Sequence, residues 1–108
     1  MPHSRLFAAT IMLVSSCTHL VQLFVYPAES NLVNAIIVFY AFAYFLIGMF
    51  LLGRSRPVLW VAILVPAIGG ILASIRVATM PVNPLVYFHL AVDMLVVLIC
   101  IGLLKHRL

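Results

Sequence analysis

The stretch "LVSSCTHLVQLF", residues 13–24, decides how the fold is read, because it interrupts an apolar run with small and polar residues. Residues 14–17, Val-Ser-Ser-Cys, have the form of a lipobox, where a signal peptide is cut and its cysteine is lipidated. A lipoprotein normally continues with a polar tether, whereas here the apolar run resumes beyond Cys17 over residues 20–25. We therefore expect an uncleaved membrane helix that carries His19 in its interior.

The composition identifies the solvent. Of 108 residues, 67% are hydrophobic and 7% are charged, and the mean hydropathy is +1.31. A soluble domain of this length needs a far more charged surface. The net charge of +4 comes from cations that stand singly or in pairs between apolar runs, which suits membrane topology rather than a nucleic-acid-binding face. The expected partner is the lipid bilayer, and no nucleic acid is expected.

Four apolar runs follow one another, each close to the ~20 residues with which a helix crosses a bilayer. The breaks between them are short, so neighbouring helices are expected to be antiparallel. The predicted fold is an all-α integral membrane protein, an antiparallel four-helix transmembrane bundle with short loops, formed by one domain over residues 1–108. The helices are expected at about 6–26, 32–53, 57–79 and 84–104.

Residues at the breaks carry the chemistry of helix ends. Ser30 and Asn83 are plausible N-caps, because their side-chain oxygens can accept from backbone amides of the first turn. Pro57 and Pro84 stand where a first helical residue is expected, and Gly53 stands where a helix C-cap belongs.

The positive residues predict the orientation. Four spans put both termini and the middle loop on one side, and the other side holds Glu29 and, at the end of the third run, Arg76. Since cytoplasmic segments carry the excess of lysine and arginine, we expect both termini in the cytoplasm of a multi-pass protein in a prokaryotic plasma membrane. The residues on the cytoplasmic side are Arg5, Arg54, Arg56, Lys105 and Arg107.

Arg76 and Asp93 are the strongest candidates for an internal ion pair. Ionisable groups at membrane depth are costly and usually face the bundle interior. Counting 1.5 Å per residue, Arg76 lies about 6 Å and Asp93 about 13 Å below the outer edge. Helical side chains lean toward the helix N-terminus, so these two lean toward each other from antiparallel helices. We expect a structural pair that neutralises two membrane charges, with a proton or ion site as the alternative.

His19 and His89 are the candidates for a bound metal or haem, with Asp93 or Glu29 as a further ligand. A bis-histidine haem needs two facing imidazoles at one level. The two histidines lean in opposite directions from similar depths, which counts against that pairing. The principal interpretation is satisfied polar residues in a packed bundle, and the sequence requires no cofactor.

Small residues on the third run predict close helix packing. Gly69 and Ala73 align with Arg76, and Gly70 with Ser74 forms a second small-xxx-small pair. The face that carries Arg76 is therefore expected to be packed.

Function is predicted mainly from the motifs that the chain lacks. It has no Walker loop, HExxH, CxxC or nucleophile elbow. Small multidrug transporters have a similar length and four spans, but they carry a membrane-embedded glutamate in the first helix, whereas the only glutamate here is Glu29 in a loop. We expect a non-catalytic accessory or scaffold subunit beside other integral membrane subunits of a respiratory, photosynthetic or oxygenase complex. The alternatives are a small homo-oligomeric transporter or channel that uses the outer polar residues, and a metal- or haem-bearing redox subunit.

Overall fold

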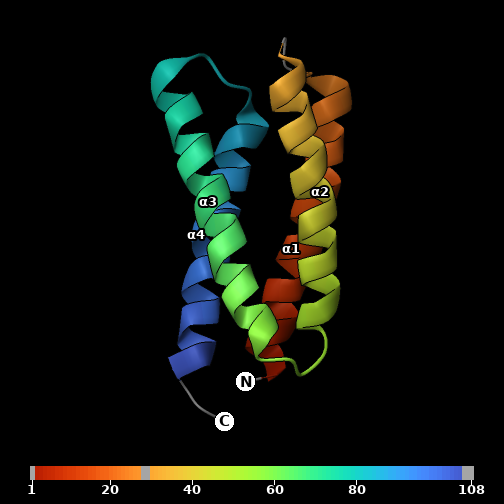
Figure 1. The fold of residues 1–108 in the computed structure, drawn as a ribbon, viewed down its shortest axis with the longest axis vertical. Helices are drawn as coiled ribbons and strands as arrows, with labels where there is room; N and C mark the ends of the chain where they lie inside the picture. Colours follow the sequence, from red (N-terminus) through yellow and green to blue (C-terminus); the bar gives the residue numbers. More distant parts are fainter. Residues whose placement is uncertain (1, 28–29, 106–108) are drawn as a thin grey trace.

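The computed structural model describes residues 2–27 and 30–105 and contains four helices (Figure 1). Each helix is long and apolar enough to cross a membrane, and the described residues form no strand. The predicted all-α four-helix membrane bundle is thereby confirmed. The helices are α1 (Pro2–Val25), α2 (Asn31–Leu51), α3 (Pro57–Thr79) and α4 (Pro84–Lys105).

The helix boundaries follow the predicted capping residues with one exception. Ser30 Oγ accepts from the Val33 amide at 3.4 Å, and Asn83 Oδ1 accepts from the Leu85 amide at 3.0 Å. The exception is the end of α2, where Leu52 is the C-cap and Gly53 follows it. The amides of both residues bond carbonyls three residues back, so the last turn tightens and needs no left-handed glycine.

Two further limits differ from the prediction. The first helix begins at Pro2, not near residue 6, because proline suits the first position of a helix, where its missing amide hydrogen leaves no bond unmade. The second ends at Leu51, two residues before the expected 53.

The bundle consists of two helical hairpins, α1 with α2 and α3 with α4, and α1 also packs along α4. The contact between α2 and α3 is the smallest of the helix contacts. In Figure 1 these two helices meet near the loop 52–56 and diverge toward their other ends. We call the half of the bundle next to this loop the closed half, and the other half the open half.

The closed half has an apolar core. Residues of all four helices meet there with their side chains almost entirely buried, and none of them is polar. Close packing of this kind leaves no polar path along the axis of the bundle. The core residues of the closed half are Ala8, Ala9, Met12, Ile47, Leu51, Val58, Leu59, Ala62, Val96, Cys100 and Leu103.

Arginines tie the helix ends of the closed half together. Arg5 donates from Nε to the Leu51 carbonyl at 3.0 Å and from Nη1 to the Ser55 carbonyl at 3.0 Å. Arg56 donates from Nη2 to the Leu104 carbonyl at 3.1 Å. The last carbonyls of a helix lack intrahelical partners and carry partial negative charge, so a guanidinium stabilises them. Two residues that predict the orientation therefore also fix the helix ends.

Candidate functional site

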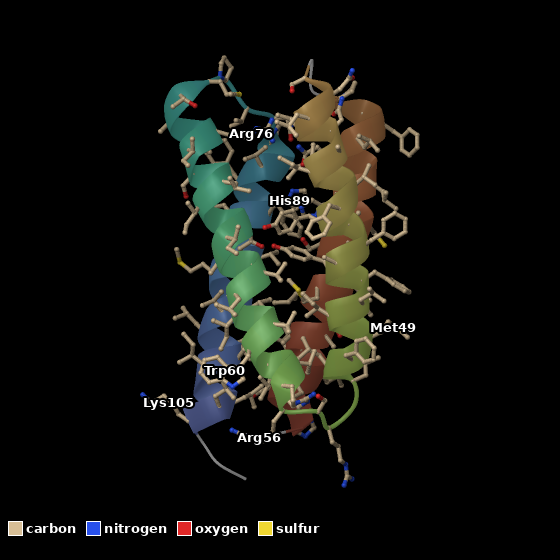
Figure 2. The ribbon with its side chains drawn as sticks, viewed as in Figure 1. Met49, Arg56, Trp60, Arg76, His89 and Lys105 are labelled. Carbon is tan, nitrogen blue, oxygen red and sulfur yellow. The ribbon has the colours of Figure 1, made fainter. Side chains whose placement is uncertain are left out.

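The polar side chains inside the membrane segments gather in the open half, between all four helices. They line a cavity of about 200 Å³, and the other residues that line it are aliphatic or glycine. Figure 2 looks into this region between α2 and α3, with His89 below Arg76 and both above the closed half. We call these residues the polar cluster: His19, Gln22, Tyr40, Tyr44, Arg76, His89 and Asp93.

The two histidines form a stacked pair. Their ring centroids lie 3.7 Å apart and the rings are inclined by only 9°. His19 comes from α1 and His89 from α4, and their side chains are 8% and 5% exposed. The opposite tilts of the two side chains are expected to keep the rings from facing each other, and the structure contradicts this, because the rings lie face to face.

Hydrogen bonds to the Ser15 carbonyl fix the protonation of the pair. His19 Nδ1 lies 2.7 Å from this carbonyl, which can only accept, so Nδ1 carries the hydrogen. Thr18 donates its single hydroxyl proton to the same carbonyl at 2.9 Å and therefore accepts from His89 Nε2 at 2.8 Å. The neutral rings are thus an Nδ1–H tautomer at His19 and an Nε2–H tautomer at His89. His19 keeps the lone pair of Nε2, and His89 that of Nδ1.

Asp93 is held by a tyrosine. The Tyr44 hydroxyl donates a hydrogen bond to Asp93 Oδ1, and the two residues are 0% and 4% exposed. The ring of Tyr44 also meets His19 edge to face at 5.2 Å. Tyr40, one turn earlier, donates to the Val65 carbonyl of α3 at 3.3 Å. These contacts join all four helices. His89 of α4 stacks on His19 of α1, which meets Tyr44 of α2, and Tyr44 binds Asp93 of α4. Tyr40 adds the link from α2 to α3.

Gly69 makes room for this arrangement. A Cβ at Gly69 would lie 3.0 Å from the Tyr44 hydroxyl oxygen and 3.3 Å from Asp93 Oδ2. A Cβ at Gly70 would be in ordinary contact, 3.6 Å from Asp93 Cβ. Ala73 also lines the cavity, whereas Ser74 is exposed beside a shallow groove between α3 and α4. The close approach that the small residues of α3 allow is thus centred on Gly69.

The predicted ion pair between Arg76 and Asp93 is not formed in the structure. Both residues line the cavity, but the hydroxyl of Tyr44 occupies Oδ1 of Asp93. Arg76 lies nearer the open end, and its Nε is buried without a hydrogen-bond partner among the described residues. Charge and helical depth suggest only Arg76 as a partner for Asp93, because a tyrosine carries no charge. A tyrosine on α2 at the depth of Asp93 reaches the carboxylate without spanning the axial offset.

The stacked geometry of His19 and His89 does not suit a shared metal ion or a haem between the two rings. Ring-nitrogen lone pairs lie in the ring plane, so two nearly parallel rings in van der Waals contact do not aim at one ion. A bis-histidine haem requires the porphyrin between its two ligands, and here the rings touch. No group of three histidine, cysteine, aspartate or glutamate side chains is placed to hold a metal ion within residues 2–27 and 30–105. Glu29, the fourth candidate ligand, lies outside the described residues.

Chemically, the polar cluster offers hydrogen bonds and one permanent positive charge. Ser15 Oγ lies 3.4 Å from His19 Nδ1, but that nitrogen already donates to a carbonyl and cannot act as a base for the serine. Arg76 is a donor only, while Asp93 and His19 Nε2 are acceptors. Comparison of the chain with protein-family models, with curated proteins and with solved structures finds no match.

Proposed function

We propose that this chain is a small, non-catalytic accessory subunit that packs beside other integral membrane subunits of a larger complex. The observation that carries the proposal is a stripe of large side chains on the side of α2 away from the bundle. Its members, 48% to 66% exposed, recur at intervals of three and four residues. Figure 2 shows Met49 of this stripe on the outer side of α2. The stripe consists of Phe39, Phe42, Leu46 and Met49.

The spacing of this stripe suits a helix of another subunit. Positions separated by three and four residues form the seam with which two helices interlock side chains over several turns. Lipid can also cover such a face, but two phenylalanines followed by a leucine and a methionine offer large side chains that can interlock with those of a neighbouring helix. In a bilayer, van der Waals packing of this kind is a main source of helix association. The expected occupant is an apolar transmembrane helix of an unlike chain.

The closed half supports a role without transport through the chain itself. Its apolar core separates the polar cluster from the end that carries the arginines, so a solute that entered the cavity would meet close-packed aliphatic side chains. The cavity is the observation that favours the alternative of a small homo-oligomeric transporter. In that case the path would run between copies of the chain, and Asp93 would be needed for movement of the solute or ion.

The orientation is part of the same proposal. Arg5, Arg54, Arg56 and Lys105 all belong to the closed half, and Figure 2 shows Arg56, Lys105 and Trp60 at that end and Arg76 at the other. The positive-inside rule then directs the closed half to the cytoplasm and the cavity to the outer leaflet. A prokaryotic plasma membrane is the setting in which we place the protein.

Site-specific crosslinking tests the proposal. A photoreactive phenylalanine replaces Phe42 in the stripe or, as the matched control, Leu64 on α3, which is 57% exposed. We expect the Phe42 position, after illumination of native membranes, to yield one adduct with an unlike membrane protein that also co-migrates stoichiometrically in a native gel. The Leu64 position should yield much less. Adducts only with further copies of the chain would contradict the accessory role and favour the homo-oligomer.

A second test addresses the other two alternatives. The purified protein in liposomes is expected to move no solute or ion in a manner that Asp93→Asn abolishes. The isolated protein is also expected to hold no stoichiometric haem or metal that is lost on changing His19 or His89. Either positive result would overturn the non-catalytic assignment.

A further inference from the structure

The cavity of the open half is accessible from the lipid. Leu72 and Ile75 of α3 line it and are also 39% and 54% exposed, so the cavity reaches the surface of the bundle beside α3. On the other side its wall is formed by α2, the helix with which α3 makes the least contact. An aliphatic wall and a lateral opening favour a ligand that dissolves in the bilayer.

The volume of the cavity limits the size of the ligand. At about 200 Å³ it exceeds the roughly 150 Å³ cavity that accommodates benzene in an engineered protein core. One substituted six-membered ring therefore fits, and any longer chain on that ring would extend through the lateral opening into the lipid. The ring of Tyr40, 8% exposed, forms part of the wall and offers an aromatic contact.

The mouth of the cavity donates hydrogen bonds. Arg76 lines the cavity and lies above His89, toward the open end (Figure 2), and its buried Nε has no partner among the described residues. A guanidinium stays charged and has donors only, and a buried donor left unpaired is destabilising. A ligand oxygen in the cavity would accept from the terminal nitrogens of this guanidinium, since the residue lines the cavity.

The floor of the cavity accepts hydrogen bonds. His19 donates from Nδ1 to the Ser15 carbonyl, which leaves a lone pair on Nε2. Asp93 accepts from the Tyr44 hydroxyl through Oδ1, and its Oδ2 lies beside Gly69. Asp93 and Gly69 both line the cavity. A ligand that reaches the floor therefore needs a hydrogen-bond donor.

From this polarity we propose that the cavity binds a lipid-soluble quinol, a six-membered aromatic ring with hydroxyl groups on opposite sides. One quinol oxygen accepts from Arg76 at the mouth, and the opposite hydroxyl donates to His19 Nε2 or Asp93 Oδ2 at the floor. The ring packs between the aliphatic wall and Tyr40. The site is a binding site only, and no electron or proton transfer is part of the proposal.

The same polarity predicts which related molecules bind less well. The oxidised quinone has two carbonyl oxygens and no hydrogen-bond donor. One oxygen can accept from Arg76, but the other would lie next to His19 Nε2 and Asp93 Oδ2, which are also acceptors. A site with buried polar groups discriminates strongly against a ligand that leaves them unpaired. A fatty acid carboxylate also satisfies Arg76, but its acyl chain would leave His19 and Asp93 without a partner.

The test uses the full chain in lipid nanodiscs and isothermal titration calorimetry under anaerobic conditions. The probes are a short-chain 1,4-benzoquinol, the corresponding quinone and dodecanoate. We expect saturable quinol binding, roughly tenfold or more tighter than that of the quinone or of dodecanoate, since a lost buried hydrogen bond to such a site weakens binding by about this factor. Arg76→Gln should weaken quinol binding by a similar factor, and Arg54→Gln, at an exposed arginine of the closed half, should not.

A second variant covers the case in which Arg76→Gln does not fold. Leu72→Phe enlarges a partly exposed side chain at the lateral opening and is expected to block the quinol while the helix content stays unchanged. Absence of saturable quinol binding, equal affinity for quinol and quinone, or tightest binding of dodecanoate would each overturn the proposal. Failure of the crosslinking experiment above would leave it intact, because the stripe on α2 and the cavity lie on different sides of that helix.

Discussion

The hydrogen bond between Tyr44 and Asp93 is the contact whose removal should reveal most about the open half. Tyr44→Phe deletes only the hydroxyl and leaves the ring in contact with His19. The carboxylate Oδ1 then loses its donor at a place where Asp93 is 4% exposed. A buried acceptor that loses its donor incurs its full desolvation penalty, so this small change should be felt strongly.

The magnitude follows from the burial of both partners. Hydrogen bonds to charged groups contribute about 1.5–3 kcal/mol in soluble proteins, whereas couplings between membrane helices average about 0.6 and reach about 1.7 kcal/mol. Tyr44 and Asp93 are 0% and 4% exposed, which places this pair at the upper end of the membrane range. We expect Tyr44→Phe to lower the free energy of unfolding by about 2 kcal/mol, and the coupling between the two residues to be about 1.5 kcal/mol.

The assay is unfolding in mixed micelles by increasing fractions of sodium dodecyl sulfate, followed by circular dichroism. The double-mutant cycle combines Tyr44→Phe with Asp93→Leu, which has a similar volume but no acceptor. Tyr87→Phe is the matched control, since Tyr87 is 55% exposed on α4, and its loss should stay within about 0.5 kcal/mol. A second cycle of Arg76→Gln with Asp93→Leu should give a coupling below about 0.5 kcal/mol, because the structure holds no bond between these two residues.

Two results would refute this reasoning. The first is a Tyr44→Phe variant no less stable than Tyr87→Phe, which would mean that the hydroxyl does not support Asp93. The second is a coupling of Arg76 with Asp93 larger than that of Tyr44 with Asp93. That outcome would restore the ion pair expected from the sequence.

Three further predictions concern the packing, the orientation and the closed half. A Cβ at Gly48 would lie 2.8 Å from an α1 leucine, so Gly48→Ala should destabilise the bundle by about 1–2 kcal/mol in the same unfolding assay. A Cβ at Gly102 would meet nothing within 4 Å, so Gly102→Ala should stabilise the bundle by up to about 1 kcal/mol. A reporter active only outside the cytoplasm, fused after Leu108, should be silent, and strong activity would reverse the proposed orientation. Arg5→Gln should cost about 1 kcal/mol by freeing the carbonyl of Leu51, and unchanged stability would show that this half-exposed arginine is dispensable.

The helices could be predicted well because their signals are local. The length of each apolar run fixes the number of spans, and capping side chains act on amides two or three residues away, as Ser30 and Asn83 do. The end of α2 was less predictable. Gly53 offered a left-handed cap, but the amides of Leu52 and Gly53 bond carbonyls three residues back, and Arg5, from another helix, donates to the Leu51 carbonyl.

The candidate site could be predicted only in outline. Counting residues along antiparallel helices predicts polar side chains of similar depth, and the structure brings His19, His89 and Asp93 to one cavity with Arg76. The residue count does not give the contacts among these side chains, because they depend on how each helix is rotated about its axis. Tyr44 is one of the polar residues of its helix, but no sequence signal gives it precedence over a charged partner for Asp93.

The sequence by itself determined the apolar character of the spans, the number of helices and the position of each polar residue along its helix. These properties depend on composition and on the fixed rise of a helix, so neighbours along the chain suffice to specify them. Only the tertiary structure decided that His19 stacks on His89, that Tyr44 holds Asp93, and that Arg76 faces a cavity. The physical reason is that the rotation of each helix about its axis and its distance from its neighbours are set by side-chain packing across the bundle. A bare glycine at position 69 is what allows the polar side chains of the other helices to meet beside α3.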